Sequence, residues 1–200
     1  MIAMALVPLM VTIGVAWAAT TDNMFPTLQT GSNCWLGMGH YPCQTDNREV
    51  YFYMDSSGEY KLESEDRSVV NAAIDGEYRP TALAFHYDSS PVFEGSGETD
   101  IIYQEGSTGL PDSVAGRTWC NADGNRPYNC DQQYIRIRGA GAYHYARVCH
   151  ETGHAVGLQH GDNASPQLSK TDSRLGCLVT PSTGHNDLGA NNRENINGAY

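Results

Sequence analysis

The pattern of apolar and polar positions predicts a mixed fold in which short strands alternate with two main helices. Short runs rich in β-branched and aromatic side chains, bounded by glycine, serine or aspartate, are typical of strands. Such runs occupy residues 50–54, 81–87, 99–104 and 132–138. The last run alternates polar with apolar residues, which predicts a strand with one solvent-exposed face.

Two segments show instead the spacing of apolar residues that an amphipathic helix requires. The first covers residues 64–74, with Ser64 as its cap and acidic residues in its first turn, and Gly76 is expected to end it. The second covers residues 143–158. In the glycine- and asparagine-rich tail, a short helix is expected over residues 192–196.

The start of the chain differs in composition from the rest. Residues 1–18 contain no charged side chain and end in Ala-Trp-Ala, the small-x-small pattern that signal peptidase recognises. This predicts a cleaved signal peptide; the alternative is a membrane anchor that stays attached, for which the run is short against the roughly 20 residues of a span. No internal repeat or long linker follows, so residues 19–200 are expected to form one domain.

The chain has 6 cysteines, all of them after the leader. An even number behind a signal peptide indicates disulfides and an oxidising compartment, so the protein is expected to be secreted. Proximity favours Cys34–Cys43 and Cys120–Cys130, which leaves Cys149–Cys177 by elimination. Buried free thiols are the alternative for that third pair. In another alternative, Cys34 or Cys43 caps a metal as a latency device, although a nearby disulfide is the simpler reading.

The balance of charges narrows the choice of partners. With 12 basic and 23 acidic residues, the formal net charge is -11. An acidic surface repels phosphate backbones and anionic lipid headgroups. The expected partners are therefore protein or peptide substrates, with no nucleic acid and no stable membrane association after leader removal, and the protein is expected to be a monomer.

The second predicted helix carries the residues with the clearest chemistry, in the run His-Glu-Thr-Gly-His-Ala-Val-Gly-Leu-Gln-His from residue 150 to residue 160. His150 and His154 are four residues apart, so both imidazoles lie on one helix face and can reach one metal ion. Gly157 can adopt a positive φ and end the helix, which lets His160 approach from a third direction. Three protein ligands leave a fourth position open, as in a catalytic zinc site.

Glu151 lies beside this predicted metal site, where its carboxylate can act as a general base. Zinc lowers the pKa of bound water from 15.7 to about 7, and Glu151 would take the proton as the water attacks a peptide carbonyl. The sequence thus predicts a zinc endopeptidase with one catalytic ion. A secreted zinc-binding protein without peptidase activity and a zinc amidase or deacetylase are the alternatives.

Several other residues could in principle serve at a metal or near it. Asp162 could replace His160 as a ligand, but a place in the loop or beside His160 is favoured. His144 is expected at a solvated helix start, and His185 on a surface loop, with substrate contact as its alternative. Residues 123–125 resemble a fragment of a calcium loop, but a hairpin turn is favoured and calcium has no other support. His40 and His86 have no partners at metal-ligand spacing.

The residues His150, Glu151, His154, Gly157 and His160 resemble the HExxHxxGxxH motif of the metzincin superfamily of secreted zinc endopeptidases. The small size and leader are most similar to the bacterial snapalysin-like proteases, which often have aspartate as the third ligand. The resemblance implies an α+β fold: a twisted N-terminal sheet over an active-site helix, with a small irregular C-terminal subdomain.

One feature departs from that family pattern. Metzincins carry a methionine in a turn beneath the metal, and the corresponding turn of this chain, residues 177–181, has none. Leu178 or Val179 would supply the apolar floor there. A Cys149–Cys177 disulfide would tie the start of the helix to this turn.

Overall fold

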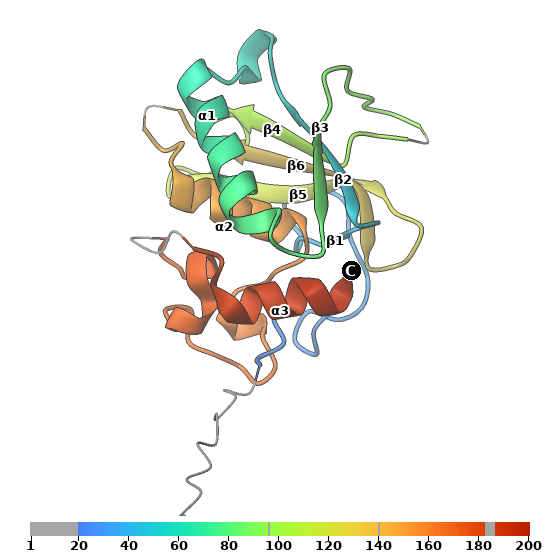
Figure 1. The fold of residues 1–200 in the computed structure, drawn as a ribbon, viewed down its shortest axis with the longest axis vertical. Coiled ribbons are helices and arrows are strands. Elements are labelled where there is room, and N and C mark those ends of the chain that lie inside the picture. The colour runs from blue at the N-terminus through green and yellow to red at the C-terminus, as the bar shows by residue number, and fades with distance from the viewer. Residues whose placement is uncertain (1–19, 96, 140, 183–186) are drawn as a thin grey trace, which may run out of the picture.

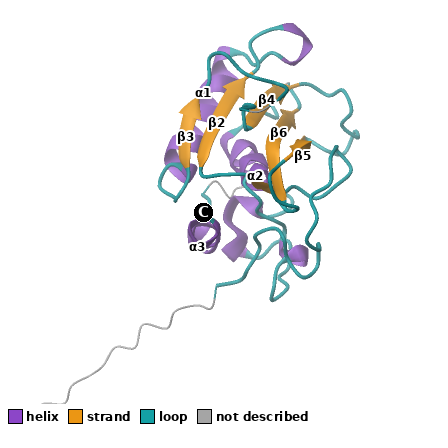
Figure 2. Cartoon of the chain, turned by 90° about the vertical axis from the view of Figure 1, so that its right-hand side faces the viewer, coloured by secondary structure: helices purple, strands orange, loops and turns teal. Residues whose placement is uncertain are grey.

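The computed structural model describes residues 20–95, 97–139, 141–182 and 187–200 (Figure 1). The predicted leader, residues 1–18, and His185 lie outside the described residues. Helices and loops surround one six-stranded sheet (Figures 1 and 2). Within the described residues, no helix has the length and apolar character that crossing a membrane requires.

The sheet is mostly parallel and has one antiparallel strand. β6 pairs in parallel with β1 and β4, β2 pairs in parallel with β3 and β4, and β5 runs antiparallel to β6 at the other side. The strands are β1 (Gln44–Thr45), β2 (Glu49–Met54), β3 (Ala84–Tyr87), β4 (Ile101–Glu105), β5 (Gly116–Asp123) and β6 (Asn129–Ile137). All four strand predictions from the sequence are therefore confirmed, with shifted bounds.

β5 was not predicted, because its residues mix glycine, charged and polar side chains without a clear alternation. The turn that joins it to β6 confirms the hairpin expected around residues 123–125: the Gly124 amide donates to the Asn129 carbonyl at 3.1 Å. The prediction of an exposed face on β6 was wrong. Gln132 and Arg136 are buried on that face, because the loops that contain Val92 and Thr108 cover it and accept their hydrogen bonds. Gln133 lies on the other face and is also buried, with its amide donating to the Cys43 carbonyl.

Two helices pack on the opposite, apolar face of the sheet. α1 (Ser64–Ala73) and α2 (Tyr145–Ala155) contact each other, and α2 also contacts β5 and β6. The sheet residues beneath them are fully buried: Val50, Phe52, Ile101, Tyr103, Ile135 and Ile137. Burial of these side chains provides most of the driving force for joining helices and sheet.

Gly76 does not end the first helix, contrary to the sequence prediction. The chain continues from α1 into a π-helical turn, Ile74–Tyr78. Gly76 is needed there for close packing, since a β-carbon at this position would lie 2.6 Å from the Tyr145 hydroxyl oxygen.

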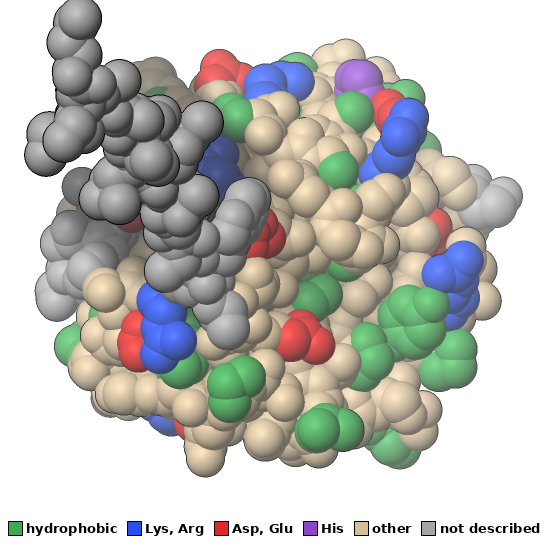
Figure 3. All heavy atoms as spheres, turned by 60° about the horizontal axis from the view of Figure 1, so that its bottom comes forward, with side chains coloured by type: hydrophobic (Ala, Val, Ile, Leu, Met, Phe, Trp, Pro, Cys, Tyr) green, Lys and Arg blue, Asp and Glu red, His purple; other side chains and the backbone are tan. Residues whose placement is uncertain are grey.

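The last part of the chain forms a small layer below α2 (Figure 1). It contains α3 (Gly189–Ala199), longer than the predicted short helix, and the 3-10 turns Gly161–Asn163 and Ser173–Leu178; a third such turn, Gly58–Tyr60, follows β2. Figure 3 views the molecule from this end: the charged side chains of both signs are scattered there among uncharged ones.

All three disulfides expected from the sequence are present: Cys34–Cys43, Cys120–Cys130 and Cys149–Cys177. Cys34 and Cys43 are thus bonded to each other, which leaves neither thiol to cap a metal. The first pair closes an irregular loop before β1, as expected, and the third joins α2 to the turn at the end of Ser173–Leu178.

Candidate metal centre

α2 holds three of the predicted site residues, with His150, Glu151 and His154 all buried. His144 caps the helix, as expected for a helix-start residue: its Nδ1 accepts the Arg147 amide at 3.3 Å. The four-residue spacing brings the rings of His150 and His154 to the same face, with centroids 4.7 Å apart.

α2 ends at Gly157, as predicted, in a Schellman motif. The Leu158 amide donates to the Gly153 carbonyl at 2.8 Å and the Gly157 amide donates to the His154 carbonyl at 2.9 Å. The φ of Gly157 is +100°, and a β-carbon would lie 2.8 Å from the Met24 sulfur. Only glycine allows both this backbone conformation and this close approach.

The chain that leaves Gly157 is fixed by the N-terminal segment. The Phe25 amide donates to the Gly157 carbonyl at 2.7 Å, and the Gln159 amide donates to the Asn23 carbonyl at 2.7 Å. These bonds direct the next residue, His160, back toward the helix.

The three histidines converge on one point. Their Nε2 atoms are 3.2 Å (His150 to His154), 3.1 Å (His154 to His160) and 3.2 Å (His150 to His160) apart. The Nδ1 of His150 donates to the Cys177 carbonyl at 2.8 Å, and the Nδ1 of His154 donates to the Leu158 carbonyl at 2.7 Å. A carbonyl only accepts, so in the neutral rings both Nε2 atoms carry a lone pair that faces the centre.

Lone pairs that face one another at this distance repel, and a cation at the centre would relieve the repulsion. For a tetrahedral zinc ion with Zn–N bonds of about 2.0–2.1 Å, neighbouring ligand nitrogens are roughly 3.3 Å apart. The observed spacing is close to that value. The donor set of imidazoles, with two tautomers fixed by carbonyls, therefore fits zinc.

The surroundings keep these histidines neutral. Burial lowers the pKa of His150 to about 3, and it lowers the pKa of His154 well below the usual value, in both cases with a smaller contribution from the neighbouring His160. Burial also lowers the pKa of His160, against an opposing effect of the Asp162 carboxylate. A neutral imidazole is the form that binds a metal.

Glu151 points to β5. Its Oε2 lies 3.0 Å from the Thr118 hydroxyl, which is also 2.9 Å from the Glu151 carbonyl oxygen. Gly116 leaves room for the carboxylate, since a β-carbon there would lie 2.8 Å from Oε1. Burial raises the pKa of Glu151 to about 7, although the bond from Thr118 opposes the shift.

The turn below the histidines contains the apolar floor that was expected without a methionine. Leu178 packs against α2 at Gly153, where a β-carbon would lie 2.8 Å from the leucine Cδ2. Val179 is also buried. The Cys149–Cys177 disulfide fixes this turn beside His150, which bonds to the Cys177 carbonyl.

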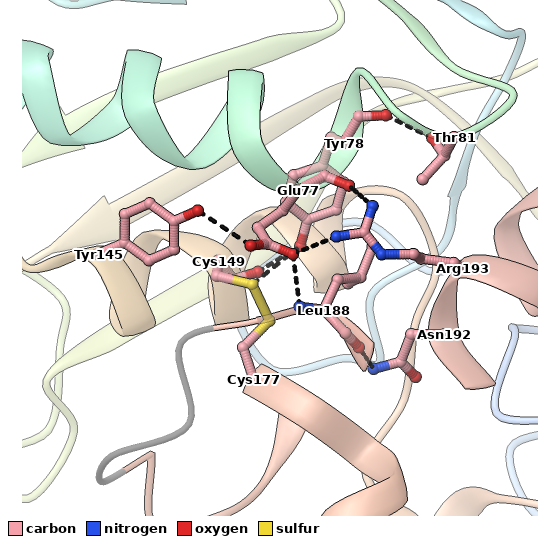
Figure 4. A network of polar contacts seen from close by, with 9 residues as sticks. All are labelled: Glu77, Tyr78, Thr81, Tyr145, Cys149, Cys177, Leu188, Asn192 and Arg193. Atoms are coloured by element: carbon pink, nitrogen blue, oxygen red, sulfur yellow. Dashed lines mark hydrogen bonds and ion pairs between the residues drawn. A yellow bond between two sulfur atoms is a disulfide. The ribbon is translucent and has the colours of Figure 1, made fainter. Parts of the chain in front are cut away.

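A buried polar network lies beside the Cys149–Cys177 disulfide (Figure 4). The Glu77 carboxylate accepts the Tyr145 hydroxyl at 3.0 Å, the Leu188 amide at 2.7 Å and the Arg193 guanidinium at 2.7 Å. The network thereby connects the π-helical turn, α2 and α3 around the disulfide.

A cavity of about 360 Å³ opens beside the three histidines and Glu151. Its walls are residues 114 and 116–118, at the start of β5, and residues 38–42 of the Cys34–Cys43 loop. His40 lies in this wall, although sequence spacing gave it no partner. Its place depends on a fold that no local pattern encodes.

The remaining candidates, Asp162 and His86, do not belong to the histidine cluster. Asp162 forms an ion pair with Lys170 at 2.9 Å, and within the part of the chain described here the cluster contains only the three histidines, so Asp162 stays a neighbour of His160. His86 bonds to Glu49 at 2.9 Å on the surface.

Comparison with known proteins does not identify the family of this chain. Neither a protein-family model nor a curated protein sequence matches this chain. Among solved structures, the chain is similar to metalloproteinase-II from Bacteroides fragilis, with a TM-score of 0.43 and 14% identity over 86% of this chain. The chain spans 58% of the length of that protein. Similarity this low defines no family, so the functional inference rests on the site residues.

Proposed function

We propose that this chain is a secreted zinc-dependent endopeptidase in which His150, His154 and His160 bind the metal and Glu151 is the general base. The observation that carries the proposal is the convergence of three Nε2 atoms, 3.1–3.2 Å apart, in a cavity that also contains the Glu151 carboxylate. A site that only held a metal would not need this carboxylate. The three disulfides fit an oxidising compartment.

Zinc, when bound, supplies Lewis-acid chemistry: it polarises a peptide carbonyl and makes water a stronger acid. The protein supplies the orientation of the ligands. The carbonyls of Cys177 and Leu158 hold two imidazoles with Nε2 toward the centre. Such outer contacts typically change metal affinity or activity 10–100-fold.

Glu151 moves the proton. Its carboxylate accepts a proton from the attacking water and passes it to the leaving amine, and such proton transfer contributes about 10²–10⁴-fold in rate. Thr118 fixes the orientation of the carboxylate, and Gly116 gives it space. Burial of the carboxylate strengthens its interaction with the reacting groups.

β5 offers main-chain groups to an extended peptide. The Cys120 carbonyl accepts the Gly37 amide at 2.8 Å on the outer edge of the strand, so the main-chain groups of Thr118, two residues earlier, face the same edge. Within the described residues, the edge at 116–118 has no main-chain partner beyond β6. An added peptide strand there would lie beside Glu151.

The test compares the secreted protein with Glu151→Gln and with Glu94→Gln as a control that changes an exposed glutamate. Zinc content is measured by mass spectrometry and cleavage is measured on casein. We expect about one zinc per chain in all three proteins and loss of cleavage, by at least about 10²-fold, only in Glu151→Gln.

Other outcomes separate the alternatives. Zinc without cleavage of casein or peptides by the wild type would favour a binding protein, and release of acetate from acylated sugars would favour a deacetylase. Absence of zinc would overturn the proposal.

A further inference from the structure

Among the residues that the structure describes, Arg117 is the only permanently cationic one that lines the cavity beside the histidines. It stands on β5 between Gly116 and Thr118, which both face Glu151. Successive side chains of a strand alternate between its faces, so Arg117 leaves β5 on the other face, above the edge where the cavity opens.

The guanidinium is anchored at the mouth of the cavity. Its Nη1 donates to the Met38 carbonyl at 2.8 Å, and Met38 belongs to the Cys34–Cys43 loop. This contact uses one of the five N–H donors of the arginine. The remaining donors bond to no other group among the described residues.

Arg117 also lacks a counter-ion in the described part of the chain, since no carboxylate lies within 4.0 Å of it. Arg79, Arg174 and Arg193 do pair with Asp75, Asp172 and Glu77. Arg117 shares its lack of a carboxylate partner with several other arginines, such as Arg136 and Arg138, but it differs from them in lining the cavity beside the histidines. The chain has 23 acidic residues, yet none of those described pairs with Arg117. The Arg117 guanidinium in the cavity wall is therefore available to an external carboxylate.

The free edge of β5 determines which group of a substrate would reach the Arg117 guanidinium. A peptide that adds to residues 116–118 places one side chain directly across from Arg117, on the same face, and opposite charges in such cross-strand pairs attract. We propose that Arg117 is the specificity-determining residue of this site and selects peptides with aspartate or glutamate close to the scissile bond. The inference rests on the proposed peptidase function.

The net charge of -11 acts against acidic substrates only at long range. At about 0.15 M ionic strength the Debye length is about 8 Å, so distant charges are screened, whereas a contact pair in a partly enclosed site is much less so. Arginine also binds a carboxylate through two parallel bonds, which adds geometric selectivity.

The test uses peptide pairs that contain glutamate or glutamine at each position around the cleaved bond, measured as kcat/KM. We expect the wild type to prefer glutamate at one position by about tenfold, the size of one charge-assisted hydrogen bond. Arg117→Gln, which removes the charge and keeps a polar side chain, reduces that ratio toward one, and Arg117→Lys retains part of it. Arg117→Glu reverses it, so that glutamine is preferred over glutamate.

Arg48→Gln, which removes an exposed positive charge away from the cavity, is the matched control and leaves the ratio unchanged. A second measurement needs no variant: the preference of the wild type decreases between 0.15 and 1 M salt, because salt weakens the pair.

A wild type that cleaves peptides without any glutamate preference, or a preference that persists in Arg117→Gln, would overturn the role of Arg117 and leave the peptidase proposal intact. A zinc-loaded wild type that cleaves none of the peptides would overturn both.

Discussion

At the scale of single residues, the Glu151 carboxylate has its position because residue 116 has no side chain. In Gly116→Ala the new methyl group would meet Oε1, and the flexible end of Glu151 would move instead of the strand. A displacement of about 1 Å at a reacting group can cost 10²-fold in rate. We therefore expect kcat/KM on a peptide substrate to fall about 100-fold with little change in melting temperature. Gly198→Ala, where the β-carbon meets open space, is the control.

Asp100 predicts a pH dependence of stability. Burial raises the pKa of its carboxyl to about 7, with further contributions from Asp46 and Asp131, while the amide of Tyr51 opposes the shift. The folded protein thus keeps a proton that the unfolded chain loses above about pH 4, so this residue lowers stability as the pH rises from about 4 to about 7.

In Asp100→Asn this loss is absent, while the amide oxygen still accepts from Tyr51. The difference in unfolding free energy between variant and wild type should increase with pH by at most about 1.4 kcal/mol per unit over that window. Urea denaturation from pH 4 to pH 8 measures it, and a constant difference would contradict the assignment.

The residues of the histidine motif were predictable because all of them are encoded in one helix and its ending. Thr118, Gly116 and Arg117 were not, because they reach the site only when β5 pairs with β6 and packs on α2. Nothing local in the sequence distinguishes them from residues of an ordinary loop.

At the scale of elements, the Cys149–Cys177 disulfide joins α2 to the turn that contacts His150. A cross-link over 28 residues stabilises by about 3.5 kcal/mol through the entropy of the unfolded chain. Replacing both cysteines by alanine should cost about that amount in urea denaturation and weaken zinc binding, because the Cys177 carbonyl is no longer fixed. Removal of Cys34–Cys43, in contrast, should leave zinc affinity unchanged.

Elements whose apolar residues recur at regular spacing were predicted well. Elements in which the burial of side chains depends on neighbouring segments were not. β2 and α2 match their expected positions closely, since their apolar residues face one core. β6 carries buried glutamines and an arginine because surrounding loops, and Gln104 of β4, accept their hydrogen bonds. Such partners come from distant segments, so alternation alone gave the wrong exposure.

At the scale of the whole molecule, the site depends on both ends of the described chain. Asn23 bonds to the Gln159 carbonyl at 3.0 Å and to Asn192 of α3 at 2.9 Å. The mixed α and β composition was predictable from the sequence, whereas the mostly parallel order of the strands could not be read from it.

Removal of the metal should destabilise the entire fold. Without a cation, the facing Nε2 lone pairs repel, and a ligand at 1,000 times its Kd stabilises by about 4 kcal/mol. We expect a chelator to lower the melting temperature in differential scanning fluorimetry and added zinc to restore it. In His160→Ala the effect of the chelator should be much smaller; an equal effect would contradict the metal assignment.

The short sequence span of the ligands has a consequence for refolding. His150, His154 and His160 lie within 11 residues, so the loops that chelation closes are short and entropically cheap. A denatured chain can therefore capture zinc before the sheet exists, while the supports from Asn23, Thr118 and Cys177 arrive only with long-range contacts. Because the denatured chain also binds, stabilisation by zinc should level off at high zinc concentration instead of rising logarithmically.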